Sequence, residues 1–269
     1  MAFKLPENKP QIPKDTPRNF FFYGETMSGK SYLANEFPAP IVLNTDGNAE
    51  ANTVPSIQLV NEKDENGRIT KSVIAQISEI LLALQTQKHT YKTVVVDVID
   101  DVIEMIKIAV CDELTPAGKP RLKSLSEIPY GKGYDFFNQA ITEMVIDLKA
   151  LPMNVIYISR QVSEYDDNGN ATKDKPSLKD KYVNLINGNS DLMIHTEKVG
   201  NNYNREVERK RKKYYMDQVD DKEILKILST IRGALEPAKA PSKPAPASEA
   251  RVKTPRDELK EALTEDDLF

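Results

Sequence analysis

Residues 20–37 read FFFYGETMSGKSYLANEF, in which an apolar run meets a helical pattern through a turn that contains two glycines. Within it, residues 24–31 have the spacing G-x-x-x-x-G-K-S, with a predicted strand before them and a predicted helix after them. Such a turn points successive backbone N–H groups at phosphate oxygens, and the positive end of the next helix strengthens the site. A chance glycine turn is the alternative, but it would not need both flanking elements. We therefore predict a nucleotide-binding loop.

The residues of this loop have separate tasks. Gly24 and Gly29 allow close backbone approaches that a Cβ atom would block. Lys30 supplies a positive charge for the outer phosphates, and Ser31 offers a hydroxyl to magnesium. We expect ATP and Mg²⁺ as cofactors, with the nucleotide bound by Gly24, Glu25, Thr26, Met27, Ser28, Gly29, Lys30 and Ser31.

A second apolar strand, residues 93–96, ends in Asp97. Ligands of open α/β sheets bind at the carboxyl ends of the strands, so this carboxylate is expected at the same edge as the loop. We expect Asp97 to hold the magnesium ion through water, together with Ser31. Taken alone, the run would be an ordinary buried strand.

Hydrolysis also needs a group that orients the attacking water. In many motor ATPases a glutamate follows the metal-site aspartate, but Val98 stands there in this chain. Asp46, just past a predicted strand at residues 41–44, is our first candidate, and Glu50 is the reserve. The alternative for Asp46 is a simple Asp-Gly turn.

Composition limits the class of protein. A chain of 269 residues with 39% hydrophobic residues predicts one globular domain and a tail. A formal charge of −4 means that nucleic-acid binding would need locally clustered cations. The single cysteine, Cys111, suits a reducing cytoplasm and is expected in the core. No segment has the ~18 apolar residues of a membrane span, so we expect a cytoplasmic protein without a membrane partner.

The order of predicted elements indicates an α/β fold, with a mostly parallel sheet between helices, an antiparallel C-terminal extension and a disordered tail. Helices are expected at residues 31–37, 72–87, 101–111, 134–151 and 222–232, and strands at 20–23, 41–44, 93–96, 155–159, 192–196 and 207–219. The expected domains are an extended arm (1–18), the folded domain (19–233), a Pro/Ala-rich linker (234–256) and an acidic tip (257–269).

The series strand, GETMSGKS, helix, strand ending in TDG, VVVD, cationic loop and VIYIS is similar to the ATPase core of the RecA-like recombinases. It resembles most the short single-domain RecA-like P-loop ATPases encoded by phages, which are associated with single-strand annealing and recombination. The segment IPYGKGYDFF and the segment VIYISRQ, which a charged hairpin is expected to follow, also look like that group, and the resemblance covers about residues 19–233.

This resemblance implies roles for individual residues. It places water activation on Asp46, where RecA has the longer glutamate. It implies that a polar residue after the strand at 155–159 senses the γ-phosphate and relays its state to a DNA-binding loop, which points to Arg160 or Gln161 and leaves both open. RecA has an amino-terminal polymerisation domain that this chain does not match, so we expect a homo-oligomer without a stated size.

Two sets of cations are candidates for binding single-stranded DNA, because lysines and arginines track phosphates and aromatic rings stack on bases. We expect both sets to leave the sheet at the nucleotide-binding edge. Solvated surface loops are the alternative reading. The first set is Lys119, Arg121, Lys123, Tyr130, Lys132 and Tyr134, and the second is Lys173 and Lys175, followed by Lys179 and Lys181.

The densest basic run has three readings: an edge strand protected by charge, an extension of the DNA groove, or an arginine finger for a neighbouring subunit. Its cations are Arg205, Arg209, Lys210, Arg211, Lys212 and Lys213. His89 and His195 are far apart in sequence and are read as ordinary histidines rather than zinc ligands.

The chain ends in EDDLF, which resembles the acidic tip of bacterial single-stranded-DNA-binding proteins. Asp266, Asp267 and Phe269 would dock a replication or recombination partner, although the proline of that tip is missing here. Self-gating on the protein's own basic loops and simple solubility are the alternatives.

Three functions therefore remain open at the level of sequence. The first is a DNA-stimulated ATPase in recombination, annealing or replication. The second is an ATPase that loads or remodels a protein such as a helicase. The third is an ATP-switched single-strand-binding module with negligible turnover, which the missing glutamate after Asp97 keeps open.

Overall fold

The computed structural model describes residues 15–47 and 53–238 of the chain. The chain divides into two units, residues 1–238 and 239–269. The proposed tail residues Asp266, Asp267 and Phe269 and the reserve carboxylate Glu50 lie outside the described residues.

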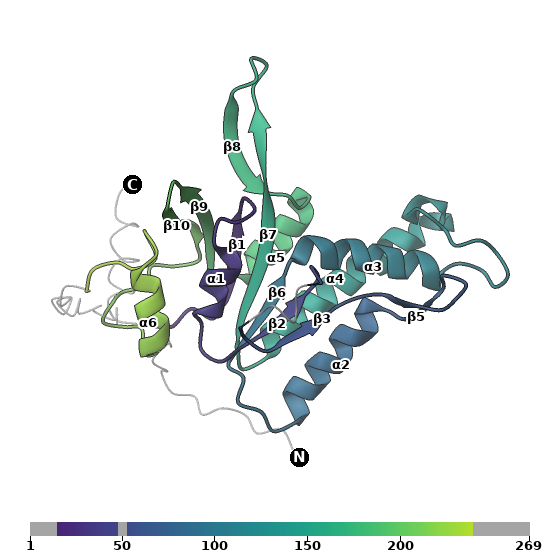
Figure 1. Ribbon diagram of the computed structural model, residues 1–269, viewed down its shortest axis with the longest axis horizontal. Helices are drawn as coiled ribbons and strands as arrows, with labels where there is room; N and C mark the ends of the chain where they lie inside the picture. The colour runs from purple at the N-terminus through teal and green to yellow at the C-terminus, as the bar shows by residue number, and fades with distance from the viewer. Residues whose placement is uncertain (1–14, 48–52, 239–269) are drawn as a thin grey trace, which may run out of the picture. The chain divides into compact units, whose positions relative to one another are not determined.

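A mostly parallel sheet forms the centre of the first unit, in the strand order β10-β9-β1-β7-β6-β2-β3 (Figure 1). Its parallel strands are β1 (Asn19–Gly24), β2 (Pro40–Asn44), β3 (Ser56–Gln58), β6 (Thr93–Asp97), β7 (Asn154–Tyr165) and β9 (Leu192–Val199). Two strands pair antiparallel, β10 (Asn202–Lys210) with β9 and β8 (Ala171–Pro176) with β7. The predicted α/β fold with an antiparallel addition is confirmed.

The apolar run at the start of the quoted stretch explains why β1 lies inside the sheet. Phe20 and Phe22 are buried in one core cluster, whereas Phe21 and Tyr23 are buried in the other. Strands covered on both faces are continuously apolar, because neither side chain direction meets water. The first cluster includes residues of α1 (Lys30–Asn35) and α6 (Lys222–Ser229), and the second includes residues of α2 (Val73–Thr86), α3 (Ile99–Glu113), α4 (Lys132–Ala150) and α5 (Asp180–Asn189).

The structure corrects several sequence expectations. The antiparallel partner of β9 is Asn202–Lys210 rather than residues 207–219, because the turn is confined to Gly200 and Asn201. Helix α5 and strand β3 were not predicted, and neither was the small hairpin of β4 (Glu62–Lys63) and β5 (Ile69–Lys71). The charged hairpin expected after VIYISRQ is present as the β7–β8 pair. The predicted core position of Cys111 is confirmed, since that residue is buried.

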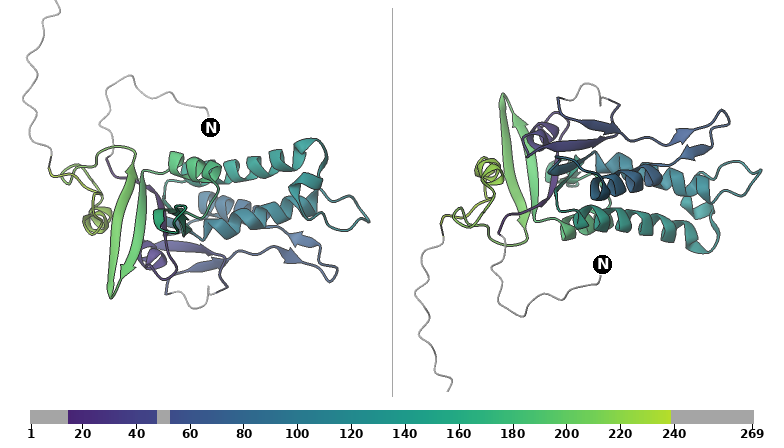
Figure 2. Two further views of the ribbon diagram at one scale, coloured as in Figure 1. Left: turned by 90° about the horizontal axis from the view of Figure 1, so that it is seen from above. Right: turned by 90° about the horizontal axis from the view of Figure 1, so that it is seen from below.

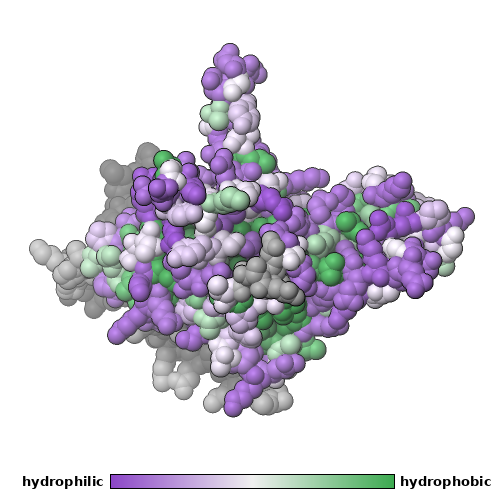
Figure 3. All heavy atoms as spheres, viewed as in Figure 1, coloured by the Kyte–Doolittle hydropathy of each residue, from purple (hydrophilic) through white to green (hydrophobic). Residues whose placement is uncertain are grey.

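Two features leave the sheet near the carboxyl ends of its strands. The β7–β8 hairpin projects away from the other elements, and α3 leads from the end of β6 toward the connection at residues 114–131 (Figures 1 and 2). Hydrophilic residues dominate the visible surface of both extensions (Figure 3). Within residues 15–47 and 53–238, no helix combines the length and the apolar character needed to cross a bilayer.

Candidate functional site

The predicted phosphate loop joins β1 to α1, and its two glycines are required by its geometry. A Cβ atom at Gly24 would lie 2.2 Å from the backbone oxygen of Thr196 on the neighbouring strand β9. Gly29 has a φ of 88°, a left-handed conformation that favours glycine, and the ring of Tyr203 packs against it. The Ser28 hydroxyl forms a 2.7 Å hydrogen bond with the hydroxyl of Thr196, which lies on strand β9. Strand β9 therefore supports the loop from one side.

Lys30 lies inside the curve of the loop. Its ammonium group donates hydrogen bonds to the carbonyl oxygens of Gly24, at 2.7 Å, and Glu25, at 2.6 Å. Burial lowers the pKa of Lys30, and the negative charge of Asp97 opposes that shift. The cation is thus held at the loop by backbone oxygens, with only 8% of the residue exposed.

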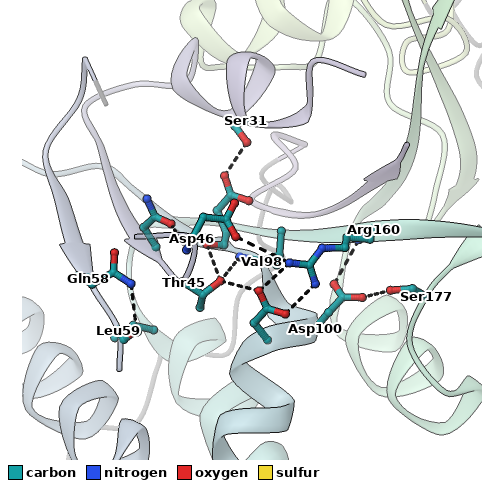
Figure 4. Close-up of polar contacts among 12 residues, drawn as sticks. Ser31, Thr45, Asp46, Gln58, Leu59, Val98, Asp100, Arg160 and Ser177 are labelled. Carbon is teal, nitrogen blue, oxygen red and sulfur yellow. Dashed lines mark hydrogen bonds and ion pairs between the residues drawn. The ribbon is translucent and has the colours of Figure 1, made fainter. Parts of the chain in front are cut away.

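Ser31 and Asp97 are brought together as predicted from the two motifs. The Ser31 hydroxyl donates a 2.6 Å hydrogen bond to Oδ2 of Asp97 (Figure 4). Burial raises the pKa of Asp97, and the Ser31 hydrogen bond partly offsets this. A hydroxyl and a carboxylate this close fit the oxygen ligands of Mg²⁺, with the remaining positions left for phosphate and water. Within the described parts of the chain, no group of three or more acidic, histidine or cysteine side chains forms another metal site.

Arg160 lies at the mouth of the same site. Its guanidinium forms two 2.7 Å hydrogen bonds with the carboxylate of Asp101 and lies 3.8 Å from Oδ1 of Asp46 (Figure 4). The hydrogen bond from Arg160 lowers the pKa of Asp101, and the same contact raises the pKa of Arg160. Asp46 is fixed through its backbone N–H, which donates to the side chain of Asn44 at 2.7 Å.

Gln161, the other candidate sensor, has different surroundings. Successive residues of a strand point to opposite faces, so Arg160 and Gln161 diverge. The Gln161 side-chain oxygen lies 2.8 Å from the ring of His195, which stacks on Tyr23 with the ring centres 4.7 Å apart. His195, read from the sequence as ordinary, thus contacts a predicted site residue. His89 stacks on Tyr91, away from these residues in the fold.

Sequence reasoning missed three polar residues of this site. Asp100 and Asp101 lie in the first turn of α3, and Thr45 directly follows β2. The Thr45 hydroxyl lies 3.2 Å from Asp101 and accepts the Val98 N–H at 3.1 Å. The two consecutive acids that begin three residues after Asp97 could have indicated this. Residues in the first turn of a helix that starts at the end of a strand stay close to that edge of the sheet.

The first set of DNA-binding candidates lies farther from the nucleotide site than expected. Helix α3 has 15 residues, a length of about 22 Å, and the connection that carries Lys119, Arg121 and Lys123 begins beyond its far end (Figure 1). The expectation that both sets leave the same edge of the sheet was therefore wrong for these cations. Lys173 and Lys175 do lie on the hairpin that extends from the end of β7.

The later members of the first set are exposed around the start of α4. Tyr130 is 94% exposed and has a φ of 60°, and Lys132 and Tyr134 follow it in exposed positions. Lys175 differs from them, because its ammonium contacts Glu164 and lies 3.9 Å from Asp180. The structure therefore separates the candidates into the remote connection, the α4 entrance and the hairpin.

Most cations of the densest basic run form hydrogen bonds or ion pairs with neighbouring groups of the protein. Arg205 forms hydrogen bonds of 2.9 and 3.2 Å with Glu36, and Arg211 binds the backbone carbonyls of Gly188 and Ser190. Strand β10 is the last strand on its side of the sheet, so the edge-strand interpretation fits residues 205 to 210. Lys210 and Lys212 are paired with Glu236 and Asp15 respectively.

Comparison with known families agrees with this geometry. A family model described as an AAA domain matches residues 16–222, which include the loop, Asp97 and Arg160. The chain belongs to this family, and membership indicates a nucleotide-binding ATPase. A search of curated proteins finds no match to the chain.

Proposed function

We propose that this protein is a RecA-like P-loop ATPase, of the kind encoded by phages, that acts on single-stranded DNA in recombination, annealing or replication. The observation that carries the proposal is the cluster at the loop mouth. There the Ser31 hydroxyl lies 2.6 Å from Asp97, and Arg160 lies between Asp101 and Asp46. A metal-binding pair, a carboxylate and a held cation at one sheet edge are the parts that phosphoryl transfer needs.

Each side chain of the cluster has a role in this reaction. Lys30 neutralises the outer phosphates, and Ser31 with Asp97 would hold Mg²⁺, which supplies charge stabilisation at the transferred phosphoryl group. Asp46 orients the attacking water. Arg160 is the γ-phosphate sensor in this proposal, because its side chain faces the carboxylates of the site, whereas Gln161 bonds His195.

Single-stranded DNA binding is supported by the exposed residues at the α4 entrance. An aromatic side chain that is 94% exposed, that of Tyr130, gains contact area when a base stacks on it. Exposed lysines beside it, such as Lys132, would contact the phosphates. No ion pair between described residues engages Lys132 or Arg121.

Anisotropy titrations of a labelled single-stranded oligonucleotide at several salt concentrations test this interface. Lys132→Ala and Arg121→Ala should each weaken binding and reduce the salt slope by about 1, without changing ATP affinity. Lys88→Ala, which removes an exposed lysine after α2, is the matched control and should bind as the wild type does. Wild-type binding and salt slope in both test variants would remove these cations from the interface.

The assembly and the tail are also part of the proposal. Met27 and Tyr32 flank Lys30 and are 81% and 69% exposed, which favours a homo-oligomer that covers the nucleotide site. The acidic tip with Asp266, Asp267 and Phe269 would dock a replication or recombination protein. Deletion of residues 265–269 should abolish capture of that partner and leave basal ATP hydrolysis intact.

A second candidate function is an ATP-switched binding module with negligible turnover. The favouring observation is Val98, an apolar residue 5% exposed, at the position after Asp97 where many motor ATPases have a glutamate. This function requires tight ATP binding with no release of phosphate. A remodelling ATPase, in contrast, would hydrolyse ATP without responding to DNA.

A further inference from the structure

A cavity lies beside the ATPase cluster, between α3, the α4 entrance and the turn that leads into α5. It has a volume of about 410 Å³, within the usual range for small-molecule sites. Its lining includes Asp100, Lys107, Tyr134, Ser177, Lys179 and Tyr182. Tyr134 and Lys179 come from the two different sets of predicted DNA-binding residues, and the cavity is where the fold brings these sets together.

Asp100 connects this cavity to Arg160. Asp100 is 9% exposed as a residue, and its carboxylate accepts hydrogen bonds from the Ser159 hydroxyl at 3.1 Å and from the Arg160 N–H at 3.2 Å. The Ser177 hydroxyl also donates to Asp100 (Figure 4), and the Ser177 N–H donates to the Arg160 carbonyl at 2.8 Å. A displacement of Ser177 therefore affects the Arg160 backbone in two ways, directly through the Arg160 carbonyl and indirectly through Asp100, which accepts from the Arg160 N–H.

We propose that this cavity is a subsite for one unstacked nucleotide of single-stranded DNA, and that Ser177 and Asp100 transmit its occupancy to Arg160. The inference rests on the proposed action on DNA and adds a binding site and a coupling residue to it. Asp100 is a positioning residue here, because it acts on the site through Arg160 rather than by touching the nucleotide at the loop.

The chemistry of the walls fits a nucleotide. Tyr134 is 49% exposed and offers a ring face for stacking, while Lys179 is exposed and can contact a phosphate. The Glu104 carboxylate can accept hydrogen bonds from the edge of a base, whereas the Ser177 hydroxyl is already donated to Asp100. A free mononucleotide has the same chemistry, so the experiment must separate it from a DNA strand.

Fluorescence of 2-aminopurine tests the subsite in the full-length protein, since stacking quenches this base. A single-stranded oligonucleotide with one 2-aminopurine should be quenched by the wild type, and Tyr134→Leu should reverse the quenching and weaken binding by about tenfold. Tyr91→Leu, just before β6 and outside both the cavity and the sets of DNA-binding candidates, is the matched control and should behave as the wild type does. Equal effects of both variants would overturn the assignment. Equally tight binding of free 2-aminopurine deoxynucleotide would overturn the assignment to a DNA strand.

The link to Arg160 is tested by the stimulation of ATP hydrolysis. Ser177→Ala should leave the oligonucleotide Kd unchanged and lower the fold stimulation by DNA by about fivefold or more, and Ser177→Thr should restore it. Wild-type stimulation in Ser177→Ala would refute the relay. If the wild type neither binds nor responds to DNA, the proposed function itself fails. If it does both while Tyr134→Leu matches Tyr91→Leu, only the subsite fails.

Discussion

The Gly24→Ala substitution tests the packing of the phosphate loop against β9. The added Cβ would lie 2.2 Å from the Thr196 backbone oxygen, 2.5 Å from its hydroxyl and 2.6 Å from the Ser28 hydroxyl. The two hydroxyls can rotate, but the Thr196 carbonyl belongs to a strand that is paired with β1 at this position. The added methyl group therefore forces the two strands or the loop apart.

The size of the effect follows from the cost of overpacking. An extra methyl group in a well-packed site costs about 1–3 kcal/mol. In a domain of this size each kcal/mol lowers Tm by about 2–4 °C, so Gly24→Ala should melt about 2–12 °C below the wild type. ATP affinity should also fall, because Ser28 and the loop backbone must move.

Thermal unfolding followed by circular dichroism measures the stability, and calorimetric titration measures ATP binding. Gly188→Ala is the matched control, because a Cβ at this position in α5 meets nothing within 4 Å. Alanine is favoured over glycine in a helix interior by about 0.5–1 kcal/mol, so this control should melt at or above the wild type. If Gly24→Ala melted with the wild type and bound ATP normally, the close contact of the loop with β9 would be wrong.

Three further substitutions separate the roles of charged residues. Asp97→Asn should abolish magnesium-dependent hydrolysis and raise Tm at pH 7. Burial raises the pKa of Asp97 above its value in the unfolded chain, so ionisation destabilises the folded state once the pH exceeds the unfolded pKa, and the gain in Tm should vanish as the pH falls below that value. Asp101→Asn removes the bidentate partner of Arg160, so steady-state kinetics should show kcat reduced about ten- to hundredfold, and an unchanged kcat would exclude the positioning role. Arg205→Ala should lower the free energy of unfolding in urea by about 1–2 kcal/mol, because the hydrogen bond to Glu36 is lost, and it should retain ATPase activity. Loss of ATPase activity at wild-type stability would instead favour the arginine-finger interpretation.

The phosphate loop and Asp97 could be predicted because their signals are local. The loop needs a fixed spacing between a strand and a helix, and Asp97 needs only an apolar strand that ends at the same edge. The register pairs Asn44 with Asp97, which places the turn after β2 beside that carboxylate and explains why Asp46 lies nearby. These relations follow from any parallel sheet with this strand order.

Other features depend on tertiary contacts that no local pattern records. The choice between Arg160 and Gln161 depends on which face of β7 each side chain points to. A shift of the strand register by one residue would exchange the two faces. Helix α5 was missed because only Tyr182 and Ile186 are buried along it, which is too few for a clear periodic signal. The position of Lys119 depended on the full length of α3, which extends two residues beyond the predicted end at Cys111.

Magnesium-dependent ATP hydrolysis, measured with and without single-stranded DNA and with Lys30→Ala as the blank, tests the proposed function as a whole. The wild type should hydrolyse ATP, DNA should increase the rate, and both rates should disappear in the Lys30→Ala variant. Tight ATP binding without hydrolysis would contradict the ATPase proposal and favour the nucleotide switch, and hydrolysis that ignores DNA would contradict the proposed action on single strands.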